Sequence, residues 1–164
     1  MTVIEWATKN PELCNCGGYA LGLKRWYKPF DCTARRRERA MVERLHDGVT
    51  IEELKNEILA QDTKFMVENF GGALSTIENP CLIPNSEKVI AYRICVDKNC
   101  RDLYTDYHFK VRDNGVWSHK QGILAPEECE LEEDKPWELL EDDDETVLHY
   151  YDSPIQYFVL KEKI

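Results

Sequence analysis

Hydrophobic residues recur at helical spacing in the first half of the chain. Residues 34–48 carry an apolar stripe on one side and arginines on the other, with Thr33 before the run and Gly48 at its end. Such residues are typical of helix starts and helix ends. Thr50, with a glutamate three residues later, forms a capping box in front of a second apolar stripe in residues 51–62. The pattern therefore predicts two amphipathic helices in succession.

Hydrophobic and polar residues alternate in the second half, where β-branched and aromatic types are frequent. A period of two is typical of half-buried strands. The predicted strands are residues 88–96, 103–111, 116–120 and 155–161. Helices followed by strands indicate an α+β fold, with N-terminal helices packed on a small antiparallel sheet. At 164 residues we expect a single domain, 1–164, with one sizeable core.

The clearest local signal is a β-hairpin around Asn114 and Gly115. An Asn-Gly pair is the preferred occupant of a two-residue type I′ turn, because both residues need positive φ. In that register Asp113 pairs with Val116, Arg112 with Trp117, Lys110 with His119, and His108 with Gln121. His108 and His119 then share one face of the sheet as diagonal neighbours. A three-residue loop would put the two histidines on opposite faces.

Charge is concentrated in residues 123–148, which carry twelve acidic residues and one lysine. The rest of the chain is nearly balanced, with 20 basic and 19 acidic groups, so nucleic acid is not an expected partner. Like charges repel and resist burial, so the block predicts a solvated acidic loop or insertion within the domain. Deleting residues 130–144 is then expected to leave the chain folded. Alternatively, this acidic surface binds a basic host protein or mimics nucleic acid.

Neither a membrane span nor a signal peptide is expected. No run of about 18 apolar residues occurs, and the start MTVIEWATKNPELC has neither a basic nor an apolar leader region. We therefore expect a cytoplasmic protein, in the host cytoplasm if the chain is phage-encoded. Seven cysteines are an odd number, which indicates free thiols in a reducing compartment. Catalysis or metal binding then becomes the question for the cysteines and histidines.

Among the cysteines, Cys16 best fits a nucleophile. Residues 14–27 predict a partly buried helix, and a thiol at a helix start has a lowered pKa. Gly17 and Gly18 leave room for a substrate to approach the sulfur. The side chains expected to bind the oxyanion are the amides of Asn10 and Asn15. The alternative is that Cys16 is a small buried apolar residue.

The two histidines allow three interpretations. They can be ordinary half-buried residues. They can bind zinc with Cys14 and Cys16, or with Cys95 and Cys100, but these spacings do not match zinc ribbons or knuckles, so no metal or cofactor is expected. Finally, one histidine can activate a cysteine as a thiolate and imidazolium pair while a second polar side chain orients the ring.

The segments NCGGYAL (15–21) and DYHFKVRDNGVWSHKQG (106–122) resemble segments of small, mostly uncharacterised bacteriophage and bacterial members of the papain-like cysteine peptidase and amidase superfamily. The resemblance covers these two motifs and the order of elements. It implies a papain-like fold with Cys16 as nucleophile and His108 as base. It further implies that His119 or Gln121, on the next strand, orients the base.

The expected function is that of a thiol hydrolase, a cysteine peptidase or amidase, acting on an amide, isopeptide or thioester bond of a protein or peptide substrate. Cys16 is expected to be the most reactive thiol at about pH 6. Replacing His108 should reduce that reactivity more than replacing His119, and Gln121 should matter least. The alternative is a non-catalytic phage interaction protein that binds a host protein through its acidic surface.

Overall fold

A computed structural model describes residues 2–97, 104–140 and 147–161 of the chain. The helices are α1 (Val3–Lys9), α2 (Cys16–Ala20), α3 (Ala34–His46) and α4 (Ile51–Asn69), with short 3₁₀ turns η1 (Pro11–Leu13) and η2 (Pro80–Leu82). The strands are β1 (Leu74–Ile77), β2 (Lys88–Asp97), β3 (Tyr104–Asp113), β4 (Val116–His119), β5 (Glu127–Glu128), β6 (Trp137–Leu140), β7 (Val147–Tyr151) and β8 (Gln156–Leu160). The fold is α+β, as predicted. In these described ranges, no helix is both long and apolar enough to cross a membrane.

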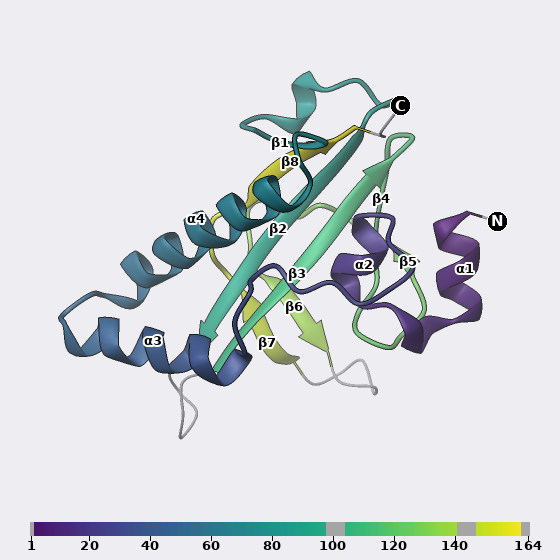
Figure 1. Ribbon diagram of the computed structural model, residues 1–164. Helices are drawn as coiled ribbons and strands as arrows, with labels where there is room; N and C mark the ends of the chain where they lie inside the picture. Colours follow the sequence, from purple (N-terminus) through teal and green to yellow (C-terminus); the bar gives the residue numbers. More distant parts are fainter. Residues whose placement is uncertain (1, 98–103, 141–146, 162–164) are drawn as a thin grey trace.

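The strands form two antiparallel sheets. The larger sheet has the order β1-β8-β2-β3-β4-β5, and β6 pairs with β7 in a separate two-stranded sheet. Helices α2, α3 and α4 cover one face of the larger sheet, while β6 and β7 lie against the opposite face (Figure 1). Strand β3 is thus enclosed between helices on one side and the β6–β7 pair on the other.

The two amphipathic helices are confirmed. Thr33 caps α3 by accepting a hydrogen bond from the N–H of Arg36, and Thr50 caps α4 in the same way. Helix α4 continues to Asn69, beyond the predicted end. The helix predicted at residues 14–27 is instead the five-residue α2, because the chain turns at Gly22 with φ +71° and runs back along it.

The Asn-Gly hairpin forms in the predicted register next to the turn, but the strands separate before the predicted pairs of Lys110 with His119 and His108 with Gln121. Asn114 and Gly115 have φ of 50° and 82°, and the pairing of Arg112 with Trp117 is the predicted register. His108 and His119 therefore share one face, and they contact each other directly. On the other face of β3, Phe109 packs into the core beneath the helices.

The described part of the acidic block, expected to be a solvated loop or insertion, contains one deeply buried side chain. Trp137 is only 2% exposed and belongs to a second apolar cluster on the far face of the sheet. The guanidinium of Arg93 and the ammonium of Lys110 both contact its ring, at 5.4 and 4.6 Å from the ring centre. Most of the acidic side chains are exposed, whereas this tryptophan is buried. Residues 141–146 lie outside the described part.

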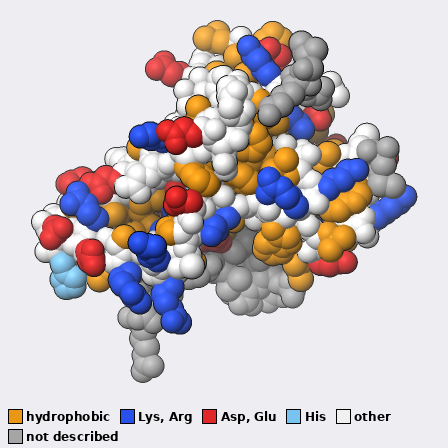
Figure 2. All heavy atoms as spheres, viewed as in Figure 1, with side chains coloured by type: hydrophobic (Ala, Val, Ile, Leu, Met, Phe, Trp, Pro, Cys, Tyr) orange, Lys and Arg blue, Asp and Glu red, His pale blue; other side chains and the backbone are white. Residues whose placement is uncertain are grey.

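The face of the sheet that the helices cover carries basic side chains, unlike the face that contacts the acidic block. Figure 2 shows Lys and Arg side chains gathered over α3, where Arg35, Arg36, Arg39 and Arg44 are exposed. Beneath this surface, Arg37 forms a buried ion pair with Asp62 at 2.5 Å, and Tyr92 donates a hydrogen bond to the same carboxylate. This network fixes α3 and α4 on the sheet, away from the histidine pair.

Candidate functional site

The motif NCGG is a compact packing device. The Asn15 side chain accepts hydrogen bonds from the backbone N–H groups of Gly18 and Tyr27, both at 2.9 Å. A Cβ on Gly18 would lie 1.8 Å from the carbonyl oxygen of Arg25. The glycine is therefore required by the returning chain, which occupies the space that the sequence suggested for substrate. These contacts fix where α2 begins, and so fix Cys16.

Cys16 lies at the edge of β3. Strand β4 pairs with β3 only at residues 111–113, so β4 leaves the edge at residues 107–109 uncovered. Helix α2 packs there, with Cys16 Sγ 4.0 Å from the carbonyl oxygen of Tyr107. Cys16 and His108 line one cavity of 170 Å³, together with Asn15, Trp26, Asp106, Tyr107, Gly122 and Tyr151. Because Cys16 and His108 line the same cavity, the two motifs meet there. Among the described residues, no hydrogen bond joins Cys16 to either histidine.

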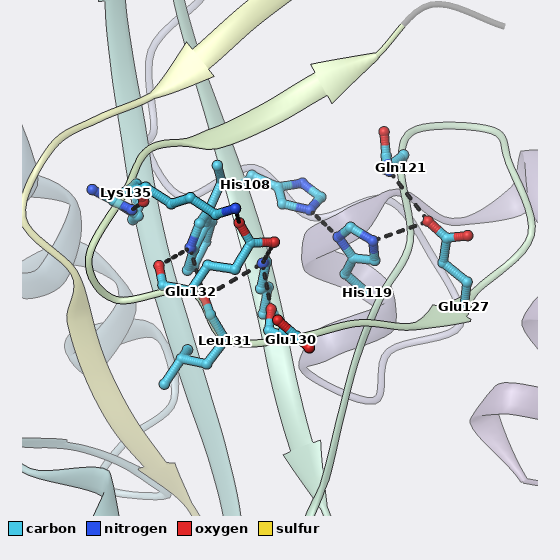
Figure 3. Close-up of polar contacts among 11 residues, drawn as sticks. His108, His119, Gln121, Glu127, Glu130, Leu131, Glu132 and Lys135 are labelled. Atoms are coloured by element: carbon cyan, nitrogen blue, oxygen red, sulfur yellow. Dashed lines mark hydrogen bonds and ion pairs between the residues drawn. The ribbon is translucent and has the colours of Figure 1, made fainter. Parts of the chain in front are cut away.

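The histidines form the start of a polar chain (Figure 3). Nε2 of His108 lies 2.9 Å from Nδ1 of His119, and Nε2 of His119 lies 3.2 Å from Oε1 of Glu127. Gln121 donates a hydrogen bond to the same Glu127 oxygen at 3.3 Å. His119 is therefore the residue that contacts His108, while Gln121 supports Glu127.

The carboxylate at the end of this chain selects the tautomers of both rings. A carboxylate only accepts hydrogen bonds, so Nε2 of neutral His119 carries the proton and Nδ1 carries the lone pair. Nε2 of His108 must then donate to Nδ1 of His119. This leaves a lone pair on Nδ1 of His108, which has no hydrogen-bond partner among the described residues. His108 is thus arranged as a proton acceptor.

Burial keeps the site uncharged. Burial, then the charge of His119 and that of Lys110, lowers the pKa of His108 well below its usual value. Burial and then the carboxylate of Asp106 raise the pKa of Cys16 to about 12, although the N–H groups of Phe109 and Gly17 act in the other direction. The resting pair is therefore a neutral thiol and a neutral imidazole, not the thiolate and imidazolium expected from the sequence. At about pH 6 the thiol is protonated, so its reactivity must be tested at higher pH.

The two asparagines do not fit the role of oxyanion donors. Asn10 ends α1, and its amide donates to the carbonyl of Trp6 at 3.0 Å, away from the residues that line the cavity. Asn15 lines the cavity, but its amide N–H groups donate to the carbonyl of Tyr27 at 2.8 Å and to the hydroxyl of Tyr107 at 3.2 Å. Both amides are already used in holding the backbone.

Two contacts that join the motifs were not predicted. Lys120 is 0% exposed, and its ammonium donates to the carbonyl of Cys14 at 2.6 Å and to that of Gly122. The hydroxyls of Tyr19 and Ser118 are 2.6 Å apart. The alternation that placed His119 on one face puts Ser118 and Lys120 on the other, toward α2. The register therefore contained the signal for both contacts.

A second cavity, of 310 Å³, is also lined by His108 and contacts His119 as well. It is lined by His108, Lys110, His119, Gln121, Glu127, Cys129, Glu130, Glu132, Lys135, Trp137 and Glu138. All four of its glutamates come from the acidic block, so that block forms part of the wall beside the histidines. In the described residues no group of three or more His, Cys, Asp or Glu is arranged to hold a metal ion, and Cys100 lies outside them.

No family model, curated protein or solved structure matches the chain. The arrangement of Cys16, His108, His119 and Glu127 must therefore carry the functional argument.

Proposed function

We propose that the protein is a thiol hydrolase of papain-like architecture that cleaves an amide, isopeptide or thioester bond by acyl transfer to Cys16. The observation that carries the proposal is the shared cavity, in which a free thiol and a histidine with an unprotonated Nδ1 lie together. The order of a cysteine at the start of a helix, a histidine on a strand and a second histidine on the next antiparallel strand also supports it.

The chemistry follows from the neutral resting pair. Nδ1 of His108 takes the thiol proton as the sulfur of Cys16 attacks the carbonyl carbon. The imidazolium gives that proton to the leaving amine or thiol, and a thioester to Cys16 remains. Water then attacks the thioester while His108 takes its proton, and the sulfur regains a proton when the carboxylic acid departs. Glu127 stabilises the transient positive charge through His119.

The cavity favours an extended acyl group over a bulky one. Its volume of 170 Å³ is small, and aromatic rings of Trp26, Tyr107 and Tyr151 form much of its wall. Trp26 is 54% exposed, so it can contact a substrate that continues into solvent. A peptide or protein chain meets both conditions, since one residue can enter the cavity while the rest lies on the surface.

Acylation with an activated thioester of a short N-acylated peptide tests this function. Intact-mass and peptide-mapping mass spectrometry of the native protein at about pH 8 should find the acyl group on Cys16. The Cys16→Ala variant should remain unmodified. His108→Gln should lose most of the acylation rate, His119→Gln a smaller part and Gln121→Ala least, because they lie progressively farther from the thiol in the hydrogen-bonded chain.

Cys95→Ala is the matched control, because Cys95 is also a buried free thiol but packs in the far-face cluster. It should acylate like the wild type. Acyl groups on the exposed Cys81 with none on Cys16 would overturn the hydrolase proposal. The alternative, a non-catalytic protein that binds a partner through its acidic surface, would then remain.

A further inference from the structure

Lys55, Lys110 and Lys120 are buried among the described residues, and Lys110 also donates to backbone carbonyls but has the carboxylate of Glu132 at 4.0 Å. Lys120 differs from both of the others. Its side chain is fully enclosed, and its hydrogen-bond acceptors are the uncharged carbonyl oxygens of Cys14 and Gly122. Lys55, which is 4% exposed, instead contacts the carboxylates of Glu52 and Asp152, both at 3.1 Å. Within the described ranges, no carboxylate forms an ion pair with Lys120.

Such a charge is costly to bury. An ammonium removed from water loses strong hydration, and neutral carbonyls compensate for this only in part. An apolar side chain of similar length would fill the same space without that cost. The cost of burying this cation is offset if a negative charge forms nearby during the reaction.

The place where a negative charge can form is the sulfur of Cys16. One acceptor of the lysine, Cys14, lies just before α2, and the other, Gly122, lines the cavity that contains Cys16. The lysine thus connects the segment that enters α2 to Gly122, which also lines the cavity. The positive charge of Lys120 also lowers the pKa of Cys16, against the larger effects of burial and Asp106.

We propose that Lys120 is a positioning residue that holds the cavity wall against α2 and stabilises the negative charge on the Cys16 sulfur as its proton leaves. This inference rests on the proposed function, because it concerns the same thiol. In this arrangement His108 accepts the proton, and Lys120 provides a fixed positive charge near the start of α2. Since His108 is neutral at rest, Lys120 supplies a positive charge that can oppose the effect of the Asp106 carboxylate on the thiol before the reaction begins.

The test compares Lys120→Met with Lys55→Met. Methionine keeps a similar length and removes the charge, and Lys55 is a buried lysine in α4 outside the cavity. The rate of iodoacetamide alkylation at Cys16 is measured by peptide mapping between about pH 7 and pH 10. We expect Lys120→Met to slow alkylation about tenfold or more at each pH, which corresponds to a thiol pKa about one unit higher. Lys55→Met should leave the rate unchanged.

A second measurement does not depend on the folding of Lys120→Met. The coupling between a negative charge at residue 16 and the ammonium is reciprocal, so a carboxylate placed there must raise the pKa of the lysine. In Cys16→Asp the pKa of Lys120, followed by the ¹³Cε signal in a protein labelled at lysine, should be higher than in the uncharged Cys16→Asn. The signal of Lys55 should titrate identically in both proteins.

The outcomes separate this inference from the proposed function. If wild-type Cys16 is neither acylated by the thioester nor alkylated faster than buried Cys95, the function itself fails. If Cys16 is acylated but a folded Lys120→Met reacts at the wild-type rate, only the role of Lys120 is overturned. If Lys120→Met does not fold, identical Lys120 titration in Cys16→Asp and Cys16→Asn overturns it.

Discussion

Trp137 should be a principal anchor of the acidic block, and replacing it with alanine should strongly destabilise the protein. The indole is 2% exposed, and its N–H donates to the carbonyls of Leu131 and Glu132 at 2.8 and 3.1 Å. Cations lie on the ring from two strands of the main sheet, Arg93 from β2 and Lys110 from β3. The substitution therefore removes apolar burial and two charge contacts together.

The magnitude can be estimated from these contacts. Replacing a buried tryptophan with alanine costs about 3–5 kcal/mol of folding free energy. Each cation contact contributes about 0.5–2 kcal/mol, part of which is included in that figure. For a chain of this size, each kcal/mol lowers Tm by about 2–4 °C. A loss of about 4 kcal/mol thus predicts a Tm lower by about 8–16 °C.

Thermal and urea unfolding, followed by circular dichroism, provide the assay. Trp26→Ala is the matched control, because Trp26 also donates its indole N–H to a backbone carbonyl, that of Glu12 at 3.1 Å, but is 54% exposed. It should lower Tm by only a few degrees, about 2–4 °C. Equal effects of the two substitutions, or a stable fold after deletion of residues 130–144, would refute the anchoring role of Trp137.

Three further predictions concern pH, the polar chain and α2. The lowered pKa of His108 means that the unfolded chain binds a proton near pH 6.5 that the folded chain does not, so stability should be full above about pH 7 and fall below it by up to about 1.4 kcal/mol per pH unit. In urea unfolding, His108→Gln should flatten this dependence, whereas replacement of the exposed His46 should not. Glu127→Gln should reduce the rate of Cys16 acylation about three- to tenfold without changing Tm. An amide can donate as well as accept a hydrogen bond, so it no longer selects one tautomer of His119. An unchanged rate would contradict the tautomer argument. Gly18→Ala should cost about 1–3 kcal/mol or more in urea unfolding, since its Cβ would meet a carbonyl at 1.8 Å, and more than Gly17→Ala, whose nearest contact is at 3.1 Å; the reverse order would contradict this packing.

The histidine pair could be predicted because it depends on local rules. The Asn114-Gly115 turn fixes the register, and the strand period then places His108 and His119 on one face without any knowledge of the rest of the fold. The capped helices α3 and α4 were predictable for the same reason. Their boundary residues act on the neighbouring backbone.

The surroundings of Cys16 could not be predicted by such rules. The length of α2 depends on the chain that returns past Gly18, and the burial of the thiol depends on β3, some ninety residues away. Sequence reasoning gave the thiol a low pKa because it considered the helix start alone. In the structure, burial outweighs that contribution and raises the pKa of Cys16 to about 12.

The contacts of the acidic block could not be predicted from side-chain charge, because its backbone oxygens also take part in them. Lys110 is 3% exposed, and its ammonium donates to the carbonyl of Glu130 at 2.7 Å. The backbone of an acidic segment can therefore satisfy a buried cation while its carboxylates stay near the surface. The same segment supplies Glu127, whose carboxylate selects the tautomers of the histidine pair, and Trp137, whose ring meets that of His108 at 6.1 Å, edge to face. The block that looked like an appendage thus forms one side of the candidate site, and its removal should impair both stability and reactivity of Cys16.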